Sequence, residues 1–142
     1  MTTRRGLLAI ALVALPFPAL AAGDALAAAI AEATGGREPT EGGIALAAPA
    51  LAENGGQVPV TVTVESPQTA ALHVRAIHLF ATRNPTPGIA TFRLSPAVAR
   101  AEVTTRIRLA EDQAIIALAE LSDGTLRRAT AAIRVTTGGC IG

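Results

Sequence analysis

The stretch Val58-Pro59-Val60-Thr61-Val62-Thr63-Val64 decides the fold of this chain. Valine occupies every second position, and proline or threonine occupies the positions between them. Successive side chains of an extended strand point to opposite faces of a sheet. The alternation therefore predicts a half-buried β-strand with one apolar face and one wetter face.

A second segment, residues 100–109, alternates just as cleanly. Arg100, Glu102, Thr104, Arg106 and Arg108 fall on one face, and small or apolar residues fall on the other. This pattern predicts a strand with one solvated face. Further strands are predicted over residues 44–48, 73–81, 89–94, 114–121 and 126–135.

Turn signals separate these strands at short intervals. Proline, glycine and asparagine recur between the alternating runs, and Asp123-Gly124 is the strongest hairpin signal in the chain. About seven short strands with such turns predict an all-β fold, an immunoglobulin-like antiparallel β-sandwich. The pattern leaves the strand topology open.

The segment before the first strand has a different character. Residues 24–33 are good helix formers with an acidic residue at the start, and Gly35-Gly36 follows them. A short N-terminal helix is therefore predicted to precede the sandwich. The length of 142 residues fits a single domain.

Residues 1–21 have the parts of an export signal. Arg4-Arg5 precedes a short apolar run, and Ala19-Leu20-Ala21 offers small residues at a cleavage site. The paired arginines favour the twin-arginine route, with an ordinary secretion signal as the alternative. We expect residues 1–21 to be a signal peptide, residues 22–135 the folded domain, and residues 136–142 a C-terminal arm. Either route predicts a periplasmic protein.

The composition excludes several classes of partner. Removing the two arginines of the signal leaves 10 basic residues against 11 acidic ones, a net charge of −1, which does not favour nucleic acid. Beyond the signal, charged residues interrupt every apolar stretch before the roughly 18 residues of a spanning helix. We therefore expect no membrane contact after signal cleavage.

The last residues of the chain contain its single cysteine, Cys140. Gly138 and Gly139 precede the cysteine, and Ile141 and Gly142 follow it. Glycines leave the backbone nearly unrestrained, so we expect a flexible arm that extends the thiol roughly 17 Å beyond Val135.

Other interpretations of this cysteine fit the sequence less well. A buried cysteine would need apolar neighbours, and Ile141 is the only one next to it in the sequence. Prenylation needs three residues after the cysteine, and two follow it. A ubiquitin-like thiocarboxylate carrier would end in Gly-Gly rather than Ile-Gly. One cysteine in an oxidising compartment must pair with another chain or stay available to react.

No residue near Cys140 activates its thiol. At the reference pKa of about 8.5, only roughly 3% of it would be thiolate at pH 7. His73 and His78 are five positions apart and, in an unbroken strand, would lie on opposite faces, which disfavours a shared metal. The acidic residues are dispersed, with Glu111-Asp112 at a predicted turn. We expect no catalytic residue, no metal and no cofactor.

The chain resembles the SoxY family, the sulfur-carrier subunits of the thiosulfate-oxidising Sox system. The resemblance covers nearly the whole length and ends at Gly138-Gly139-Cys140. The segments that carry it, besides the Arg-Arg export signal, are residues 39–44, 52–60, 84–85, 90–92, 105–110 and 122–124.

This resemblance implies a periplasmic immunoglobulin-like domain that pairs with a SoxZ-like subunit and carries its substrate covalently on Cys140. In the family, the haem-containing SoxAX joins thiosulfate oxidatively to the cysteine, SoxB hydrolyses off sulfate, and a sulfane dehydrogenase acts on the remaining sulfur in some systems. The family motif usually reads Gly-Gly-Cys-Gly-Gly, so Ile141 departs from it.

Two other functions are compatible with the residues themselves. One is an exported immunoglobulin-like interaction module that uses Cys140 for an intermolecular disulfide. The other is a metal-delivery protein that uses Cys140 with a histidine, which one thiol and two separated histidines support poorly.

Overall fold

The computed structural model describes residues 22–136, which form one helix and nine strands. The helix α1 spans Ala22–Thr34. The strands are β1 (Thr40–Glu41), β2 (Ile44–Ala47), β3 (Leu51–Ala52), β4 (Val58–Val64), β5 (Val74–Ala81), β6 (Gly88–Arg93), β7 (Ala101–Ile107), β8 (Gln113–Leu121) and β9 (Leu126–Val135).

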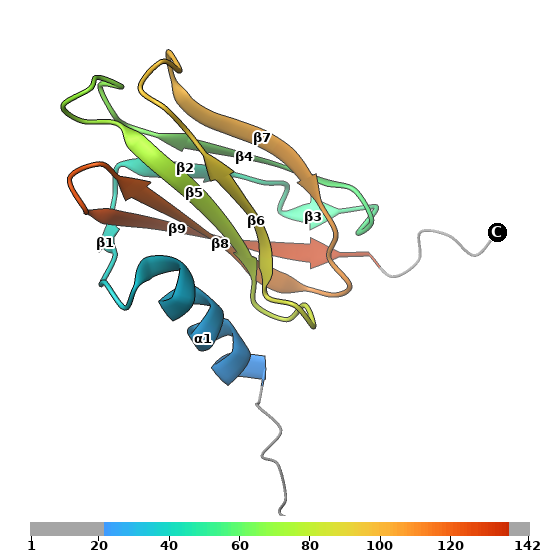
Figure 1. The fold of residues 1–142 in the computed structure, drawn as a ribbon. Coiled ribbons are helices and arrows are strands. Elements are labelled where there is room, and N and C mark those ends of the chain that lie inside the picture. Colours follow the sequence, from blue (N-terminus) through green and yellow to red (C-terminus); the bar gives the residue numbers. More distant parts are fainter. Residues whose placement is uncertain (1–21, 137–142) are drawn as a thin grey trace, which may run out of the picture.

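The strands form two sheets that pack face to face (Figure 1). The larger sheet has the order β1-β9-β8-β5-β6, with β3 also paired to β9, and the smaller sheet has the order β2-β4-β7. All pairings among the seven longer strands are antiparallel. The predicted immunoglobulin-like β-sandwich with a short N-terminal helix is confirmed. The predicted signal peptide, residues 1–21, and all of the predicted arm, residues 136–142, except Thr136 lie outside the described residues.

The main core lies between the two sheets and follows from the alternation in β4. Its four valines are at most 4% exposed, whereas the residues between them are exposed or half-buried. β7 pairs with β4 along its whole length, from Val58 opposite Ile107 to Val64 opposite Ala101. Burying one such side chain stabilises the fold by about 1.5–3 kcal/mol relative to leaving it exposed.

A second, smaller core lies on the outer face of the larger sheet, where α1 covers β5 and β8 (Figure 1). Phe80, Ile116 and Leu118 form its buried part. The helix residues that pack against them are Leu26, Ala29, Ile30 and Ala33. β5 and β8 are therefore buried on both faces, which explains their nearly continuous apolar sequences.

The helix ends where its glycines predict. Gly35 has a φ of +65°, a conformation that costs glycine little, and the Gly36 N–H donates to the carbonyl of Ala31 at 3.2 Å. The Thr34 hydroxyl donates to the carbonyl of Ile30 at 2.8 Å. Within residues 22–136, no helix has the length and apolar character needed to cross a membrane.

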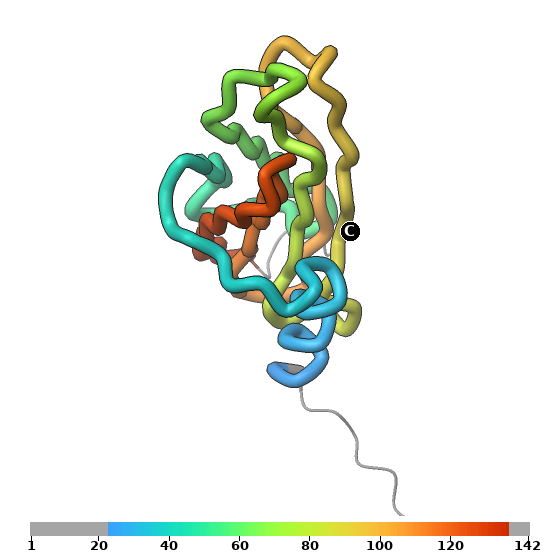
Figure 2. Tube along the Cα trace, turned by 60° about the vertical axis from the view of Figure 1, so that its left-hand side comes forward, coloured from blue at the N-terminus to red at the C-terminus, as the bar shows by residue number. Residues whose placement is uncertain are grey.

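The two short strands β1 and β3 were not predicted, since two residues are too few to display an alternation. Both pair in parallel with β9, Thr40 opposite Arg127 and Leu51 opposite Arg134, and so differ from the otherwise antiparallel arrangement. In the sequence between β1 and β3, the chain crosses from the larger sheet to the smaller sheet, where it forms β2 (Figure 2).

Candidate functional site

The predicted carrier residue Cys140 and its neighbours Gly138, Gly139, Ile141 and Gly142 lie outside the described residues. What the structure describes is the base from which this segment leaves the domain, at the end of β9 next to β3 (Figure 1). The residues that hold this end will be called the arm root: Ala52, Gly55, Leu109, Asp112, Val135 and Thr136.

Backbone groups of β9 alternate between two neighbours at the arm root. On one side, the N–H groups of Arg134 and Thr136 donate to the carbonyls of Ala50 and Ala52 at 2.9 and 3.0 Å. On the other side, the Val135 N–H donates to Oδ1 of Asp112 at 2.6 Å. The end of β9 is thus hydrogen-bonded up to Val135 on the β8 side and up to Thr136 on the β3 side.

Gly55 allows the closest packing in this region. An ideal Cβ on Gly55 would overlap the carbonyl oxygen of Leu109 and would lie 2.9 Å from Cγ1 of Val135. The Leu109 N–H donates to the carbonyl of Gly55 at 2.7 Å. A glycine is therefore required here by the approach of the two backbones.

A buried glutamine connects the loop before β6 with the loop before β8, next to the arm root. Gln113, 6% exposed, donates through Nε2 to Oδ1 of Asn84 at 2.8 Å and to the Glu111 carbonyl at 3.2 Å. Its Oε1 accepts from the N–H of Arg83 at 2.9 Å. Asn84 in turn donates to the Arg108 carbonyl at 2.9 Å. Sequence reasoning missed Gln113, because a lone polar residue at the start of an apolar strand gives no sign of its partners.

A shallow hollow of about 300 Å³ lies beside the arm root, on the outer side of β3. Pro49, Leu51, Ala52 and Pro59 supply its apolar lining. Leu51 is 52% exposed, a high value for a large apolar side chain. Glu53, Asn54 and Gln57 supply the rest of the lining, so the surface beside the arm root is partly apolar and partly polar.

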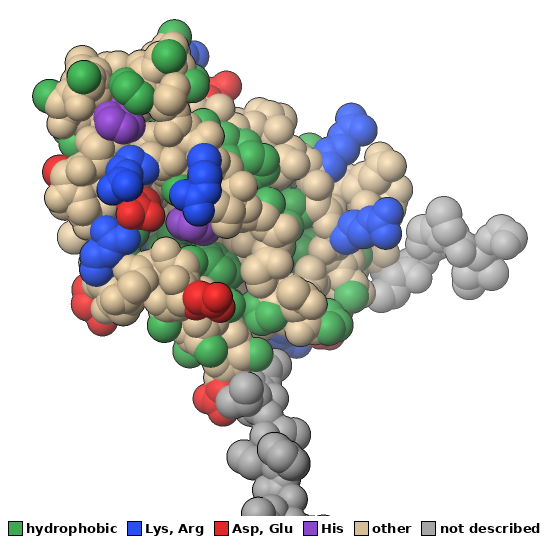
Figure 3. Space-filling view, viewed as in Figure 1, with side chains coloured by type: hydrophobic (Ala, Val, Ile, Leu, Met, Phe, Trp, Pro, Cys, Tyr) green, Lys and Arg blue, Asp and Glu red, His purple; other side chains and the backbone are tan. Residues whose placement is uncertain are grey.

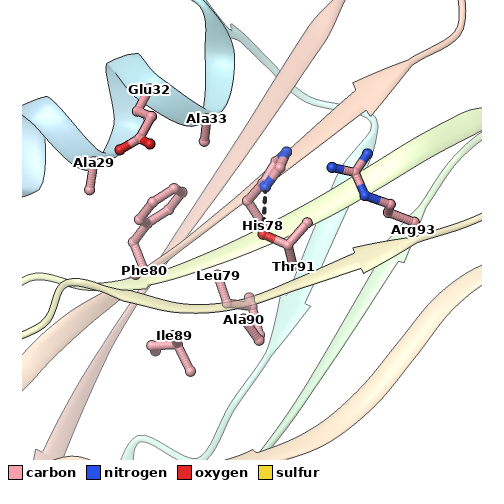
Figure 4. Close-up of a pocket in the computed structure, with 11 residues that line it drawn as sticks. Ala29, Glu32, Ala33, His78, Leu79, Phe80, Ile89, Ala90, Thr91 and Arg93 are labelled. Carbon is pink, nitrogen blue, oxygen red and sulfur yellow. Dashed lines mark hydrogen bonds between the residues drawn. The ribbon is translucent and has the colours of Figure 1, made fainter.

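A larger cleft of about 740 Å³ lies between α1 and the edge formed by β5 and β6. His78, Phe80, Thr91 and Arg93 line it from the strands, and α1 contributes Ala29, Glu32 and Ala33. Figure 4 shows the His78 ring next to the Arg93 side chain, with the helix residues across the cleft.

His78 belongs to a polar chain that connects three strands, β5, β6 and β8, with the loop after α1. Its Nδ1 lies 3.0 Å from the Thr91 hydroxyl, and its buried Nε2, without a hydrogen-bond partner among the described residues, lies 3.9 Å from Oε2 of Glu120. Glu120 pairs with Arg37 at 3.0 Å. Burial lowers the pKa of His78 and outweighs the attraction of Glu120, so the imidazole is neutral near pH 7.

The prediction that the two histidines lie on opposite faces assumed an unbroken strand. The register of β5 on β8 shifts between Val74 and Ala76, so a bulge lies between His73 and His78. Among residues 22–136, no three histidine, cysteine or carboxylate side chains are grouped as metal ligands. The bulge thus removes the geometric argument, while the described part of the chain supplies no third ligand.

The described surface carries interspersed charges of both signs, as Figure 3 shows for one face. Several acidic residues are individually engaged: Glu41 pairs with Arg128 at 3.0 Å, and Asp123 accepts from the hydroxyl and the N–H of Thr125. These bonds from Thr125 lower the pKa of Asp123. This pattern is typical of a solvated surface.

Comparison with known proteins identifies relatives of the whole domain. The family model described as sulfur oxidation protein SoxY matches residues 30–140. The sulfur carrier protein SoxY from Chlorobium limicola f thiosulfatophilum has a similar structure, with a TM-score of 0.68 and 31% sequence identity over 80% of this chain and 94% of that chain. None of the curated protein sequences matches this chain.

More distant structures share the fold alone. A superoxide reductase from Ignicoccus hospitalis is 22% identical, with a TM-score of 0.59 over 66% of this chain and 79% of that chain. A second superoxide reductase structure, described as that of a putative enzyme from Thermotoga maritima, is 23% identical with a TM-score of 0.58, over 70% and 88% of the two chains.

Proposed function

The chain belongs to the SoxY family of sulfur oxidation proteins, and from this premise we propose that it is a sulfur carrier rather than an enzyme. In this proposal, Cys140 holds sulfur intermediates covalently and presents them to partner Sox enzymes. The observation that carries the proposal is the extent of the family match, which runs to residue 140 and so includes the single cysteine of the sequence.

The reactions proposed at Cys140 need an electron acceptor and a hydrolase, and partner proteins must supply both. Loading forms a bond between Sγ and the terminal sulfur of thiosulfate, releases the thiol proton and transfers two electrons to an acceptor, the role of a haem-containing SoxAX partner. Hydrolysis by a SoxB-like partner then adds water, releases sulfate and leaves a persulfide on Cys140. A sulfane dehydrogenase, where one is present, would oxidise that remaining sulfur.

The proposed layout assigns a separate task to each part of the chain. Residues 1–21 direct export to the periplasm, residues 22–135 form the domain, and residues 136–142 form the carrier arm with Gly138, Gly139, Ile141 and Gly142 around the cysteine. The hydrogen bonds at the arm root support this division, because regular strand pairing ends at Val135.

We further propose a heterodimer with a SoxZ-like subunit. Within the described residues, β6 and β7 are edge strands of the two sheets, and unpaired strand edges favour pairing with another chain. The cleft along β6 adds a concave surface to that edge. Binding of the partner should slow amide exchange in β6 or β7, which is measured by comparing exchange with and without the partner. A strictly monomeric mature protein in the native extract, across a dilution series, would contradict the heterodimer.

The direct test of the carrier is the intact mass of the protein purified from its native periplasm. Added masses of sulfur, thiosulfate or sulfonate on Cys140 would identify the load. Finding only a cysteine-linked dimer would instead favour the interaction module.

A functional test uses Cys140→Ser in reconstituted thiosulfate oxidation. Turnover should disappear, because serine cannot form the disulfide-type bond, while the thermal melt stays unchanged. Wild-type turnover by this variant would rule out the carrier function.

A further inference from the structure

The end of β9 is held by contacts that the regular sheet does not supply. The β8·β9 ladder begins at Gln113 opposite Ile133, and the chain turns away before this point in the loop that contains Glu111 and Asp112. An antiparallel ladder continued by two residues would place Glu111 opposite Val135. The Glu111 carbonyl instead accepts from Nε2 of Gln113 at 3.2 Å.

The Asp112 side chain replaces this missing acceptor. Its Oδ1 accepts from the Val135 N–H at 2.6 Å, although the two residues are 23 positions apart in the sequence. A charged acceptor makes a stronger hydrogen bond than a neutral one. Asp112 therefore extends the hydrogen bonding of β9 on the β8 side by a further residue pair.

Thr136 supplies the matching contacts on the other side. Its N–H donates to the Ala52 carbonyl at 3.0 Å, and its hydroxyl lies 3.3 Å from that oxygen and 3.2 Å from the Glu53 carbonyl. The last described residue is thus bonded through both backbone and side chain to the segment that contains β3.

We propose that Asp112 and Thr136 are positioning residues that fix the pivot of the carrier arm at Thr136. This inference rests on the proposed function of Cys140. From Thr136 to Cys140 is four residues, a maximum reach of about 14 Å. Loss of these contacts would weaken the pairing of Arg134 and Val135 with β3, and complete fraying would reach back to Ile133, which is 1% exposed and held in the core.

Fraying to Ile133 would lengthen the free segment to seven residues and its reach to about 24 Å. The effective concentration of a tethered group falls roughly as the −3/2 power of tether length, so it would drop about twofold. By anchoring the arm at Thr136, the arm root confines the thiol to a smaller volume. It also limits how far the thiol can reach into a partner's active site.

The experiment compares Asp112→Ala with Asp112→Asn, which retains the Oδ1 acceptor. A matched control, Asp123→Ala, removes a carboxylate that accepts from the Thr125 N–H at the other end of the β8·β9 hairpin. Amide exchange at Val135 and Thr136 is measured in each variant. Asp112→Ala should speed exchange at both amides, Asp112→Asn should speed it less because it keeps a neutral acceptor, and Asp123→Ala should leave it close to wild type.

A second measurement reports on the arm itself. Because Cys140 is the single cysteine, a nitroxide on it and another on Thr130→Cys, an exposed position of β9, give a distance distribution by pulsed electron spin resonance. Asp112→Ala should broaden this distribution and extend its upper limit. Thr136→Val, which removes only the hydroxyl, should act in the same direction and serves as the test if Asp112→Ala does not fold.

The proposal that Asp112 and Thr136 anchor the arm is refuted if amide exchange and label distances stay at wild-type values in Asp112→Ala. Where that variant does not fold, the same result in Thr136→Val refutes it. It is also refuted if Asp123→Ala changes them equally. These measurements need no sulfur chemistry, so they remain valid even if Cys140→Ser retains turnover and the carrier function fails. Where the anchoring and the carrier function both hold, kcat/KM with a partner enzyme should fall in Asp112→Ala by at most about twofold, the value for complete fraying.

Discussion

Gly55 lies so close to Val135 that a Cβ atom on Gly55 would stand 2.9 Å from Cγ1 of Val135. The same atom would overlap the carbonyl oxygen of Leu109, which belongs to the backbone and cannot rotate away. The loop after β3, the loop after β7 and the end of β9 therefore meet at one glycine.

Replacing Gly55 with alanine should destabilise the domain. Overpacking of a closely packed site costs about 1–3 kcal/mol, and here the obstacle is backbone. Urea unfolding measures the loss. The matched control is Gly88→Ala, where a Cβ would meet nothing within 4 Å, and it should be close to neutral. Equal losses in the two variants would contradict the packing argument.

The stability of the domain should fall on acidification because of His78. Burial lowers its pKa in the folded state below 6.5, so the unfolded chain binds the proton more readily. The stabilising effect is present above about pH 6.5 and is lost as the pH falls through the folded-state pKa. Urea unfolding at about pH 7.5 and about pH 5.5 measures this loss, which His78→Gln should reduce. His73→Gln, with His78 intact, should retain it.

The two glycines before Cys140 should matter for delivery rather than for reactivity. Replacing Gly138 and Gly139 with proline fixes φ and removes backbone freedom, so turnover in reconstituted thiosulfate oxidation should fall severely. A thiol titration should still count one reactive thiol per chain. If the proline variant turns over like wild type, the thiol is needed but the freedom of the arm is not.

Ile141 should be dispensable for carrier function. Ile141→Gly restores the glycine usual in the family and removes a bulky side chain next to the thiol, so turnover should be unchanged or faster. The assay is the same reconstituted oxidation with saturating partner enzymes. A severe loss would mean that Ile141 makes a contact that the carrier needs.

Export should depend on the paired arginines. Replacing Arg4 and Arg5 with lysine should leave the protein in the cytoplasm, because the twin-arginine route requires both residues. Cell fractionation and the N-terminus of the exported protein, expected near Ala22, measure the outcome. Unchanged export in this variant, or in a strain without the twin-arginine translocase, would refute the route.

Local residue patterns were enough to predict most of the strands. The alternation of valine with threonine and proline predicted β4, and the run after Asp123-Gly124 predicted β9 over residues 126–135 as found. Period-two alternation and turn residues act between near neighbours in the chain. They are therefore readable without knowledge of the rest of the fold.

The sequence by itself determined the β-sandwich, the place of the helix and the family to which the chain belongs. Only the tertiary structure decided which faces α1 covers, how β1 and β3 add in parallel to β9, and that a bulge separates His73 from His78. The tertiary structure alone shows that the N–H of Val135 donates to the carboxylate of Asp112. The physical reason is that such contacts join segments distant in sequence, and their partners depend on how whole strands pack and in which register they pair.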